Sequence, residues 1–155
     1  MSVERSPLVL RKMEATDVDD IVKLGITGSS DPWSRHMFLG EMANPLSHCF
    51  VAREMGSCRA VGFICFRNVG EESELLNIGI HPLDRHKGNG RKLMEFYIDF
   101  CHERDVKRFY LEVNALNQVA IHLYRSFSYR PVGTRTKFYE GKFDALLMMK
   151  EDRGV

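Results

Sequence analysis

Several features that mark extreme classes of protein are missing from this sequence. The longest apolar runs, such as Val61–Phe66, are too short to span a bilayer. Residues 1–7 lack the apolar core of a secretory signal. An excess of charge of one sign is also lacking, since 22 basic and 21 acidic residues leave a formal net charge of +1. This balance gives no argument for nucleic acid or a membrane as a partner.

Cysteine is scarce, and its spacing does not indicate a metal site. The four cysteines contain no C-x-x-C pair, and the six histidines form no ligand-spaced cluster with them. Cys65 lies in an apolar strand-like run and Cys101 on the apolar face of a predicted helix, so both are expected to be small core residues. We therefore expect reduced thiols in a cytoplasmic protein that binds no metal.

The composition is typical of one globular domain. The 155 residues are 44% hydrophobic and 28% charged, and this length is sufficient to bury a sizeable core. No internal repeat, low-complexity tract or Gly/Ser/Pro-rich linker divides the chain. We expect a single domain over residues 1–155.

The predicted elements follow the order β-α-α-β-β-β-α-β-α-β-β, which indicates a mixed α/β fold. Thr16 is expected to cap the first helix, whose first turn would carry three aspartates where the helix dipole favours anions; Gly25 and Gly28 would end it. A strand–helix–strand unit from Leu75 to Val113 implies at least one parallel pairing. Strands are predicted over residues 8–13, 49–53, 60–68, 75–80 and 109–113 and twice within 129–150, and the later helices over 34–43, 89–103 and 117–127.

The segment between strand 75–80 and helix 89–103 has the features of an anion site. Pro82 stops the strand, and Gly88 and Gly90 remove side chains that would hold a ligand away from the backbone. The N–H groups of the helix's first turn have no helical partners, and the helix dipole favours a negative group beside them. Four basic side chains and His86 surround the same turn. An ordinary solvated strand-to-helix turn has a similar composition, so both interpretations stay open at this point.

The form of the motif is more specific than its composition. The Walker pattern G-x-x-x-x-G-K-[ST] is absent, and the Rossmann pattern G-x-G-x-x-G is not matched. Residues 85–90 read R-x-x-G-x-G. This form resembles the [Q/R]-x-x-G-x-[G/A] motif of the GNAT acetyltransferase superfamily, in the same strand–loop–helix setting. The order of elements and the length also agree with that superfamily over nearly the whole chain.

More narrowly, the sequence resembles the bacterial ribosomal-protein-alanine N-acetyltransferases. The shared segments are Pro32-Trp33-Ser34, Leu76–Pro82, Leu111-Glu112-Val113, Asn117–Tyr124, Phe138-Tyr139 and Asp144–Leu146. The resemblance implies a partly parallel central sheet of about seven strands flanked by about four helices. In two places the chain departs from the family: Ser128-Tyr129 replaces a glycine–aromatic pair, and Asn89 replaces a commonly apolar residue.

The resemblance also implies acetyl-CoA as the cosubstrate, with its pyrophosphate on the loop. The loop residues expected to bind it are His86, Lys87, Gly88, Asn89, Gly90 and Arg91. The backbone of Ile78, Gly79 and Ile80 would bond the pantetheine arm like an added strand and stabilise the oxyanion, where two parallel strands splay apart. Asn117 would also bond the cofactor. Two alternatives remain open, namely that strand 75–80 is fully paired and that Asn117 is only a helix cap.

Acetyl transfer to an amine requires a base for the amine proton and an acid for the thiolate. The resemblance assigns the base to Glu112 and the acid to Tyr124. On strand 109–113, Glu112 points away from the apolar residues Leu111 and Val113, and partial burial strengthens a carboxylate as a base. The alternatives are a surface glutamate on an edge strand and a half-buried tyrosine with its hydroxyl at the surface.

Trp33 and Tyr139 are the candidates for contact with the acceptor. Trp33 is the only tryptophan, and its simplest role is that of a core residue. Tyr139 is expected in the loop before the last strand. The resemblance implies transfer to the N-terminal α-amine of a small-subunit ribosomal protein, with alanine as the expected first residue. Acetylation of a small-molecule amine and a non-catalytic acetyl-CoA-binding module are the alternatives.

Overall fold

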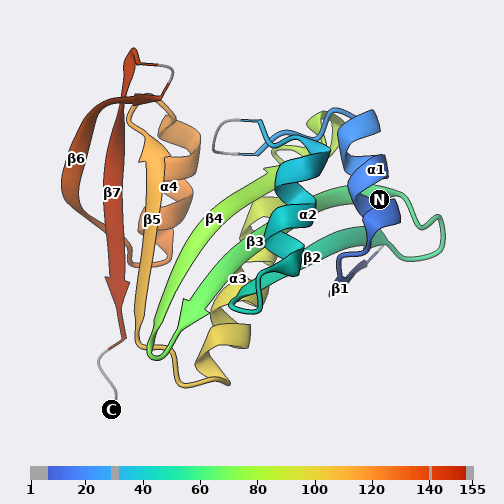
Figure 1. Ribbon diagram of the computed structural model, residues 1–155, viewed down its shortest axis with the longest axis horizontal. Helices are drawn as coiled ribbons and strands as arrows, with labels where there is room; N and C mark the ends of the chain where they lie inside the picture. Colours follow the sequence, from blue (N-terminus) through green and yellow to red (C-terminus); the bar gives the residue numbers. More distant parts are fainter. Residues whose placement is uncertain (1–6, 29–31, 140, 153–155) are drawn as a thin grey trace, which may run out of the picture.

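A computed structural model describes residues 7–28, 32–139 and 141–152, and its central feature is a seven-stranded sheet (Figure 1). The strand order is β1-β2-β3-β4-β5-β7-β6, and every pairing is antiparallel except β4 with β5. The mixed, partly parallel α/β fold is therefore confirmed. The strands are β1 (Leu8–Lys12), β2 (Ser47–Glu54), β3 (Ala60–Val69), β4 (Glu72–Ile80), β5 (Arg108–Asn114), β6 (Arg130–Tyr139) and β7 (Phe143–Glu151).

Two pairs of helices cover the two faces of the sheet. The helices α1 and α2 lie on the face toward the viewer in Figure 1, and α3 and α4 lie behind the sheet. Each face has its own buried apolar cluster, so the sheet is the middle of three layers. Cys65 and Cys101 are fully buried in these clusters, as expected. The helices are α1 (Ala15–Lys23), α2 (Arg35–Ala43), the 3-10 turn η1 (Pro82–Asp84), α3 (Asn89–His102) and α4 (Gln118–Ser126).

The strands β4 and β5 are paired over only part of their lengths. Their parallel register runs from Glu72 with Arg108 to Leu75 with Leu111 and then ends. On the other edge of β4, the register with β3 shifts so that Leu76 has no partner. Such a bulge bends and twists a strand, and β4 turns away from β5 just beyond it. This divergence of the two strands beyond Leu75 and Leu111 is termed the fork.

The start of α1 differs from the prediction. Glu14, and not Thr16, is the N-cap, so the helix begins at Ala15 and only Asp17 of the three aspartates lies in the first turn. The carboxylate of Asp17 accepts the Glu14 N–H at 2.8 Å and bonds the guanidinium groups of Arg11 and Arg53. Burial alone would raise the pKa of Asp17, but these hydrogen bonds outweigh it and lower the pKa. Reciprocal bonds between Glu14 and Asp17 therefore set the helix start, and the guanidinium groups from the sheet hold the Asp17 carboxylate in place.

None of the helices in the described ranges has the length and apolarity needed to cross a bilayer.

Ser128, which occupies the position of the family's glycine, adopts a left-handed backbone with φ of 71°. Its N–H bonds the carbonyl of Arg125 after α4. Because a side chain in this conformation is strained, we expect Ser128→Gly to raise the free energy of unfolding by about 1 kcal/mol. Urea denaturation measures this change. Ser128→Ala is the control, since it keeps the strain and should bring no gain; a glycine variant no more stable than wild type would contradict the assignment.

Candidate active site

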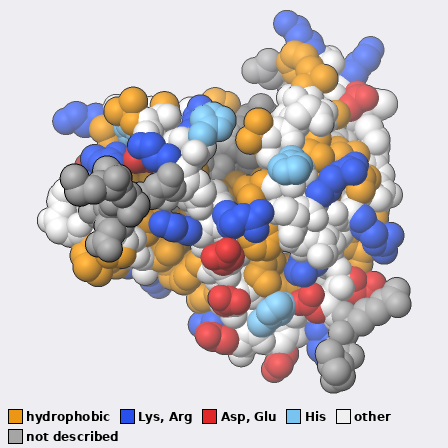
Figure 2. Space-filling view, turned by 180° about the vertical axis from the view of Figure 1, so that it is seen from behind, with side chains coloured by type: hydrophobic (Ala, Val, Ile, Leu, Met, Phe, Trp, Pro, Cys, Tyr) orange, Lys and Arg blue, Asp and Glu red, His pale blue; other side chains and the backbone are white. Residues whose placement is uncertain are grey.

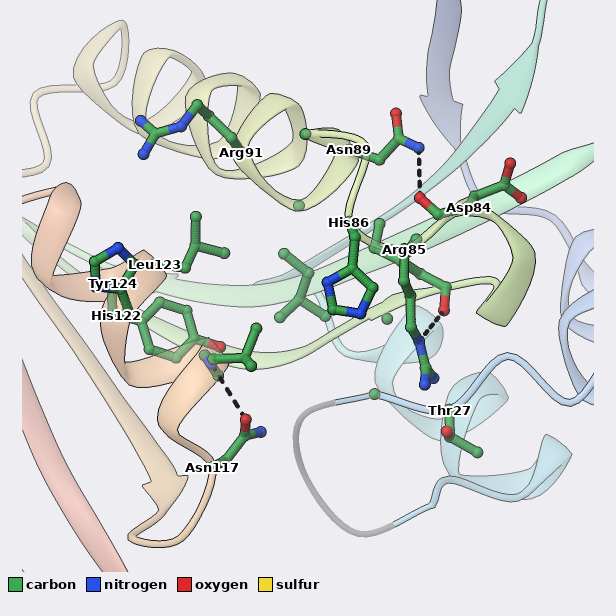
Figure 3. A pocket seen from close by; sticks show the side chains of 18 residues that line it. Thr27, Asp84, Arg85, His86, Asn89, Arg91, Asn117, His122, Leu123 and Tyr124 are labelled. Carbon is green, nitrogen blue, oxygen red and sulfur yellow. Dashed lines mark hydrogen bonds between the residues drawn. The ribbon is translucent and has the colours of Figure 1, made fainter.

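A cavity of about 680 Å³ opens beside the fork. Its size is within the range of sites for small molecules. On the face that carries α3 and α4, the surface is indented, and Lys, Arg and His side chains stand around the indentation (Figure 2). The walls are the end of β4, the loop before α3, the first turns of α4, and the short segment Thr27–Gly28 (Figure 3).

The end of β4 has one edge that β5 does not pair. Ile78, Gly79 and Ile80 all line the cavity, and β3 pairs with them only on their other edge. The alternative of a fully paired strand is therefore wrong. Part of the open edge is nevertheless occupied, because Gly28 forms an isolated antiparallel bridge with Gly79. A Cβ at Gly79 would lie 2.7 Å from the Thr27 carbonyl oxygen, so this close approach requires glycine.

Gly28 therefore has a different role from the one predicted. The helix α1 already ends at Lys23, and Gly25 beyond it has a left-handed φ of 67°. Gly28 instead lies against the buried side chain of Asn77, where an added Cβ would be 1.7 Å from Oδ1. Gly28 thus permits the α1–α2 connection to approach β4 at the cavity.

The loop before α3 presents a helix N-terminus to the cavity. Gly88 is the N-cap with a left-handed φ of 82°, and His86 is also left-handed with φ of 61°. The first helical bond joins the Lys92 N–H to the Gly88 carbonyl, so the N–H groups before Lys92 have no helical acceptor. A Cβ at Gly90 would lie 3.3 Å from a methyl group of Leu123 on α4. The arrangement is that of an anion site built from backbone.

Two of the predicted cations line the cavity but already contact other protein groups. The Nε of Arg85 donates to the Ile80 carbonyl at 3.2 Å. The guanidinium of Arg91 donates to the Ser126 hydroxyl at 2.9 Å and lies 5.1 Å from the centre of the Phe127 ring. These contacts fix the rim of the site. The backbone N–H groups are therefore the more direct donors to a bound phosphate.

The remaining basic residues of the loop differ in whether they line the cavity. His86 lines the cavity, as predicted. Lys87 and Lys92 are exposed and are not among its lining residues. The structure thus brings Lys87 less close to the site than the motif implied. Both lysines still contribute positive charge near the loop.

Asn89, one of the departures from the family, is buried at the first position of α3. Its Nδ2 donates to the main-chain carbonyl of Asp84 at 2.9 Å (Figure 3). This bond to the preceding turn gives the buried amide of Asn89 a hydrogen-bond partner beside the cavity. Sequence reasoning missed Asp84, an acidic residue in the wall of a site for anions.

The helix α4 contributes Asn117 and Tyr124 to the cavity. Asn117 is the N-cap, and its side chain accepts the Ala120 N–H at 3.2 Å. Tyr124 is 2% exposed, and its ring extends from α4 into the cavity wall (Figure 3). The surface-hydroxyl alternative for Tyr124 is therefore wrong. Ala120, three residues after Asn117, also lines the cavity, and so does Leu123, three residues further along the helix.

Glu112 lies on β5, one residue past the last pair with β4. Since β5 pairs with both β4 and β7, the edge-strand alternative is wrong. Leu111 and Val113 face the core under α3 and α4, so Glu112 points toward the opposite face. Its side chain is 22% exposed, and Oε1 lies 3.2 Å from Nη2 of Arg135.

Glu112 and Tyr124 thus approach the fork from opposite faces of the sheet. Glu112 is not among the residues that line the cavity, whereas Tyr124 is. Beyond the pair of Leu75 with Leu111, no strand pairing joins β4 to β5. A ligand bound in the cavity and a second ligand bound on the opposite face of the sheet would therefore approach each other at the fork.

Trp33 and Tyr139 were predicted to contact the acceptor amine. Trp33 lies away from the cavity, and the side chain of Tyr139 is outside the described part of the structure. Trp33 is half-buried, its ring centre is 5.2 Å from that of Phe38, and it packs against the cluster under α1 and α2. It does not line the cavity. The backbone of Tyr139 pairs with Phe143 at the end of β6, and its side chain lies outside the described part of the chain.

Among the residues that the structure describes, no three His, Cys, Asp or Glu side chains are grouped so that they could hold a metal ion.

Comparison with known proteins agrees with this geometry. Residues 18–129 match the model of the acetyltransferase (GNAT) family. The chain belongs to the GNAT family. It is an N-acetyltransferase, and acetyl-CoA is its cosubstrate.

Its similarity to individual members of the GNAT family extends over most of the chain. It is 30% identical to the ribosomal protein bS18-alanine N-acetyltransferase of Escherichia coli, over 90% of this chain and 94% of that protein. It is 29% identical to the N-alpha-acetyltransferase RimI of Mycobacterium tuberculosis, over 99% and 98%. The crystal structure of the ribosomal-protein-S18-alanine N-acetyltransferase from Escherichia coli superimposes with a TM-score of 0.84 at 27% identity, covering 96% of each chain.

Substitution can separate the observed capping role of Asn117 from the cofactor contact predicted for it in this GNAT enzyme. Asn117→Ala removes the cap and should lower the free energy of unfolding by about 1 kcal/mol. Asn117→Ser keeps a capping oxygen, so its stability should stay near that of wild type. If the amide also contacts the cofactor, both variants raise KM for acetyl-CoA. Thermal unfolding and steady-state kinetics measure the two effects; an unchanged KM in the serine variant would leave Asn117 as a cap only.

Proposed function

We propose that this enzyme transfers the acetyl group of acetyl-CoA to the N-terminal α-amine of a protein. The favoured acceptor is an alanine at the N-terminus of a small-subunit ribosomal protein, such as bS18. The observation that carries the proposal is the near-complete overlap with enzymes of that name, at 30% identity in sequence and a TM-score of 0.84 in structure. In this proposal, residues 1–155 form a single cytoplasmic domain.

The cofactor in this proposal spans two walls of the cavity. Its pyrophosphate accepts hydrogen bonds from the N–H groups of residues 86–91, where the left-handed turn exposes them. The pantetheine arm runs along the part of the Ile78–Ile80 edge that the Gly28 bridge leaves unpaired, and bonds the strand there as an added partner. Backbone N–H groups of the same strand are the donors for the carbonyl oxygen as it becomes an oxyanion.

Glu112 is the base in this proposal. An α-amine has a reference pKa of about 8, well below that of lysine, so a carboxylate acting directly or through one water is an adequate acceptor of its proton. The Arg135 guanidinium, 3.2 Å away, holds the carboxylate on the acceptor side of the fork. The neutral amine then attacks the thioester carbonyl from that side.

Tyr124 is the acid, and it donates its phenolic proton to the thiolate as the carbon–sulfur bond breaks. Its position in the cavity wall on α4 supports this role, because it lies on the side of the sheet where acetyl-CoA would bind and not on the side of Glu112. Trp33 and Tyr139 are the proposed contacts of the acceptor. Trp33 packs on Phe38 near the α1–α2 connection, so any contact with the acceptor would come from its exposed edge.

Substitution of the two chemical groups tests these roles. We expect Glu112→Gln and Tyr124→Phe each to lower kcat/KM at least about 100-fold, because each removes a proton-transfer group. Matched controls are Glu74→Gln on β4 and Tyr129→Phe, which line no part of the cavity; both should keep the wild-type rate. If Glu112→Gln and Tyr124→Phe fold and retain wild-type kcat/KM, the role assignment is wrong.

The acceptor is tested by competition between substrate classes. We expect kcat/KM for a peptide that begins with alanine to exceed that for each member of a panel of small primary amines, including spermidine and aminoglycosides. Mass spectrometry of protein N-termini from a deletion strain should then show one ribosomal protein losing its acetyl group. A preference for a small amine would contradict the acceptor proposal, and acetyl-CoA binding without turnover of any amine would contradict the enzymatic role.

A further inference from the structure

An ion pair lies beneath the loop that would hold the pyrophosphate. Arg59, just before β3, donates from Nη1 and Nη2 to the two carboxylate oxygens of Asp84 at 2.6 and 2.8 Å. Asp84 ends η1 and is 6% exposed, whereas Arg59 does not line the cavity. A two-point pair of this geometry fixes the orientation of both groups. It joins the loop to a strand 25 residues earlier in the chain.

Asp84 is held at its main chain as well as at its side chain. Its carbonyl accepts the Nδ2 of Asn89 at 2.9 Å, and its N–H donates to the His81 carbonyl at 2.8 Å. Figure 3 shows the carboxylate directed away from the cavity and the carbonyl directed toward Asn89. The ion pair and the amide bond therefore connect Arg59 to the first residue of α3.

Among the four residues between these two attachments, Gly88 at the helix N-cap is left-handed without steric cost, because it is a glycine. His86 is left-handed too, and its side chain makes this conformation unfavourable. Such conformations persist only where surrounding contacts determine them. The conformation in question is the one that directs the first N–H groups of α3 at the cavity. Loss of an attachment at Asp84 would allow this loop to relax.

The same ion pair also reduces the repulsion between the Asp84 carboxylate and a pyrophosphate bound in the cavity. Asp84 belongs to the wall of the cavity, and an uncompensated carboxylate beside a pyrophosphate would repel it. The Arg59 hydrogen bonds lower the pKa of Asp84, so the carboxyl group stays ionised and its charge is cancelled by the guanidinium. Without Arg59, the carboxylate would also attract the basic side chains of its own loop, among them Lys87.

We propose that Arg59 is a positioning residue for acetyl-CoA, which it never touches. Through Asp84 and Asn89 it holds the 85–88 loop in its phosphate-binding conformation, and it neutralises the one carboxylate among the residues described in that wall. This inference rests on the proposed placement of the pyrophosphate.

The first test is Arg59→Met, which keeps an unbranched side chain without the charge. The KM for acetyl-CoA and the Kd for CoA, measured by titration calorimetry, should rise about tenfold, the size expected for one lost charge-assisted contact. The kcat and the KM for the acceptor peptide should change less than about twofold. Arg67→Met is the matched control, because Arg67, on β3, forms an ion pair at 2.7 Å with Glu41 of α2, and neither residue lines the cavity; its CoA affinity should equal that of wild type.

The second test uses suppression by Asp84→Asn. In the double variant Arg59→Met/Asp84→Asn, the uncompensated charge is gone and Asn89 can still bond the main-chain carbonyl. We expect CoA to bind this double variant more tightly than the Arg59→Met variant. If the pair were only a stabilising surface contact, the second substitution would bring no recovery of affinity.

The third test separates the phosphates from the rest of the cofactor. S-acetylpantetheine lacks the pyrophosphate, so wild type and Arg59→Met should acetylate with it at equal kcat/KM. An equal loss with both donors, or an unchanged KM for acetyl-CoA, would overturn the proposal. Calorimetry with CoA needs no acceptor, so an incorrect proposal for the acceptor would leave the Arg59 result unaffected and the two failures distinguishable.

Discussion

The early end of the β4–β5 pairing is the constraint on which the site depends. Four residue pairs hold the two strands together, and the unpartnered Leu76 then turns β4 aside. This divergence leaves one edge of Ile78–Ile80 without a strand partner. At the level of Glu112, no strand pairing joins β4 to β5 any longer. The cavity, the largely unpaired edge of β4 and the placement of Glu112 and Tyr124 on either side of the fork are consequences of the same bend.

The anion site proposed at the start of α3 relies on backbone more than on charge. Arg85 and Arg91 line the cavity, yet both guanidinium groups bond groups of the protein. The N–H groups at the start of α3 have no helical acceptors, and a left-handed turn directs them at the cavity. Backbone donors of this kind are already oriented before the ligand binds, so little ordering is needed on binding. The side chains around them chiefly fix the shape of the loop.

Local signals along the chain were sufficient for the loop and for α4. Proline, the two glycines and the change to helical periodicity act within a few residues, so the strand–loop–helix unit was predictable. Helical spacing puts Asn117 and Tyr124 on nearly the same face of α4, whereas their place at the cavity was implied by the family resemblance. The predicted start of α1 was wrong although the bonds that cap it, between Glu14 and Asp17, are local; only the contact of Asp17 with Arg53, 36 residues away, is remote. The prediction that Gly28 ends the helix was wrong because its contact with Asn77 is also remote in sequence.

By itself, the sequence determined the order of elements, the mixed fold and the helix N-terminus that faces the cavity, since these depend on residues close together in the chain. Only the tertiary structure decided where β4 leaves β5, which cations are engaged, and how Arg59 reaches Asp84. It also placed Glu112 on an internal strand facing away from Tyr124. Strand register and packing bring distant residues into contact, and neither is encoded in the spacing of a local motif.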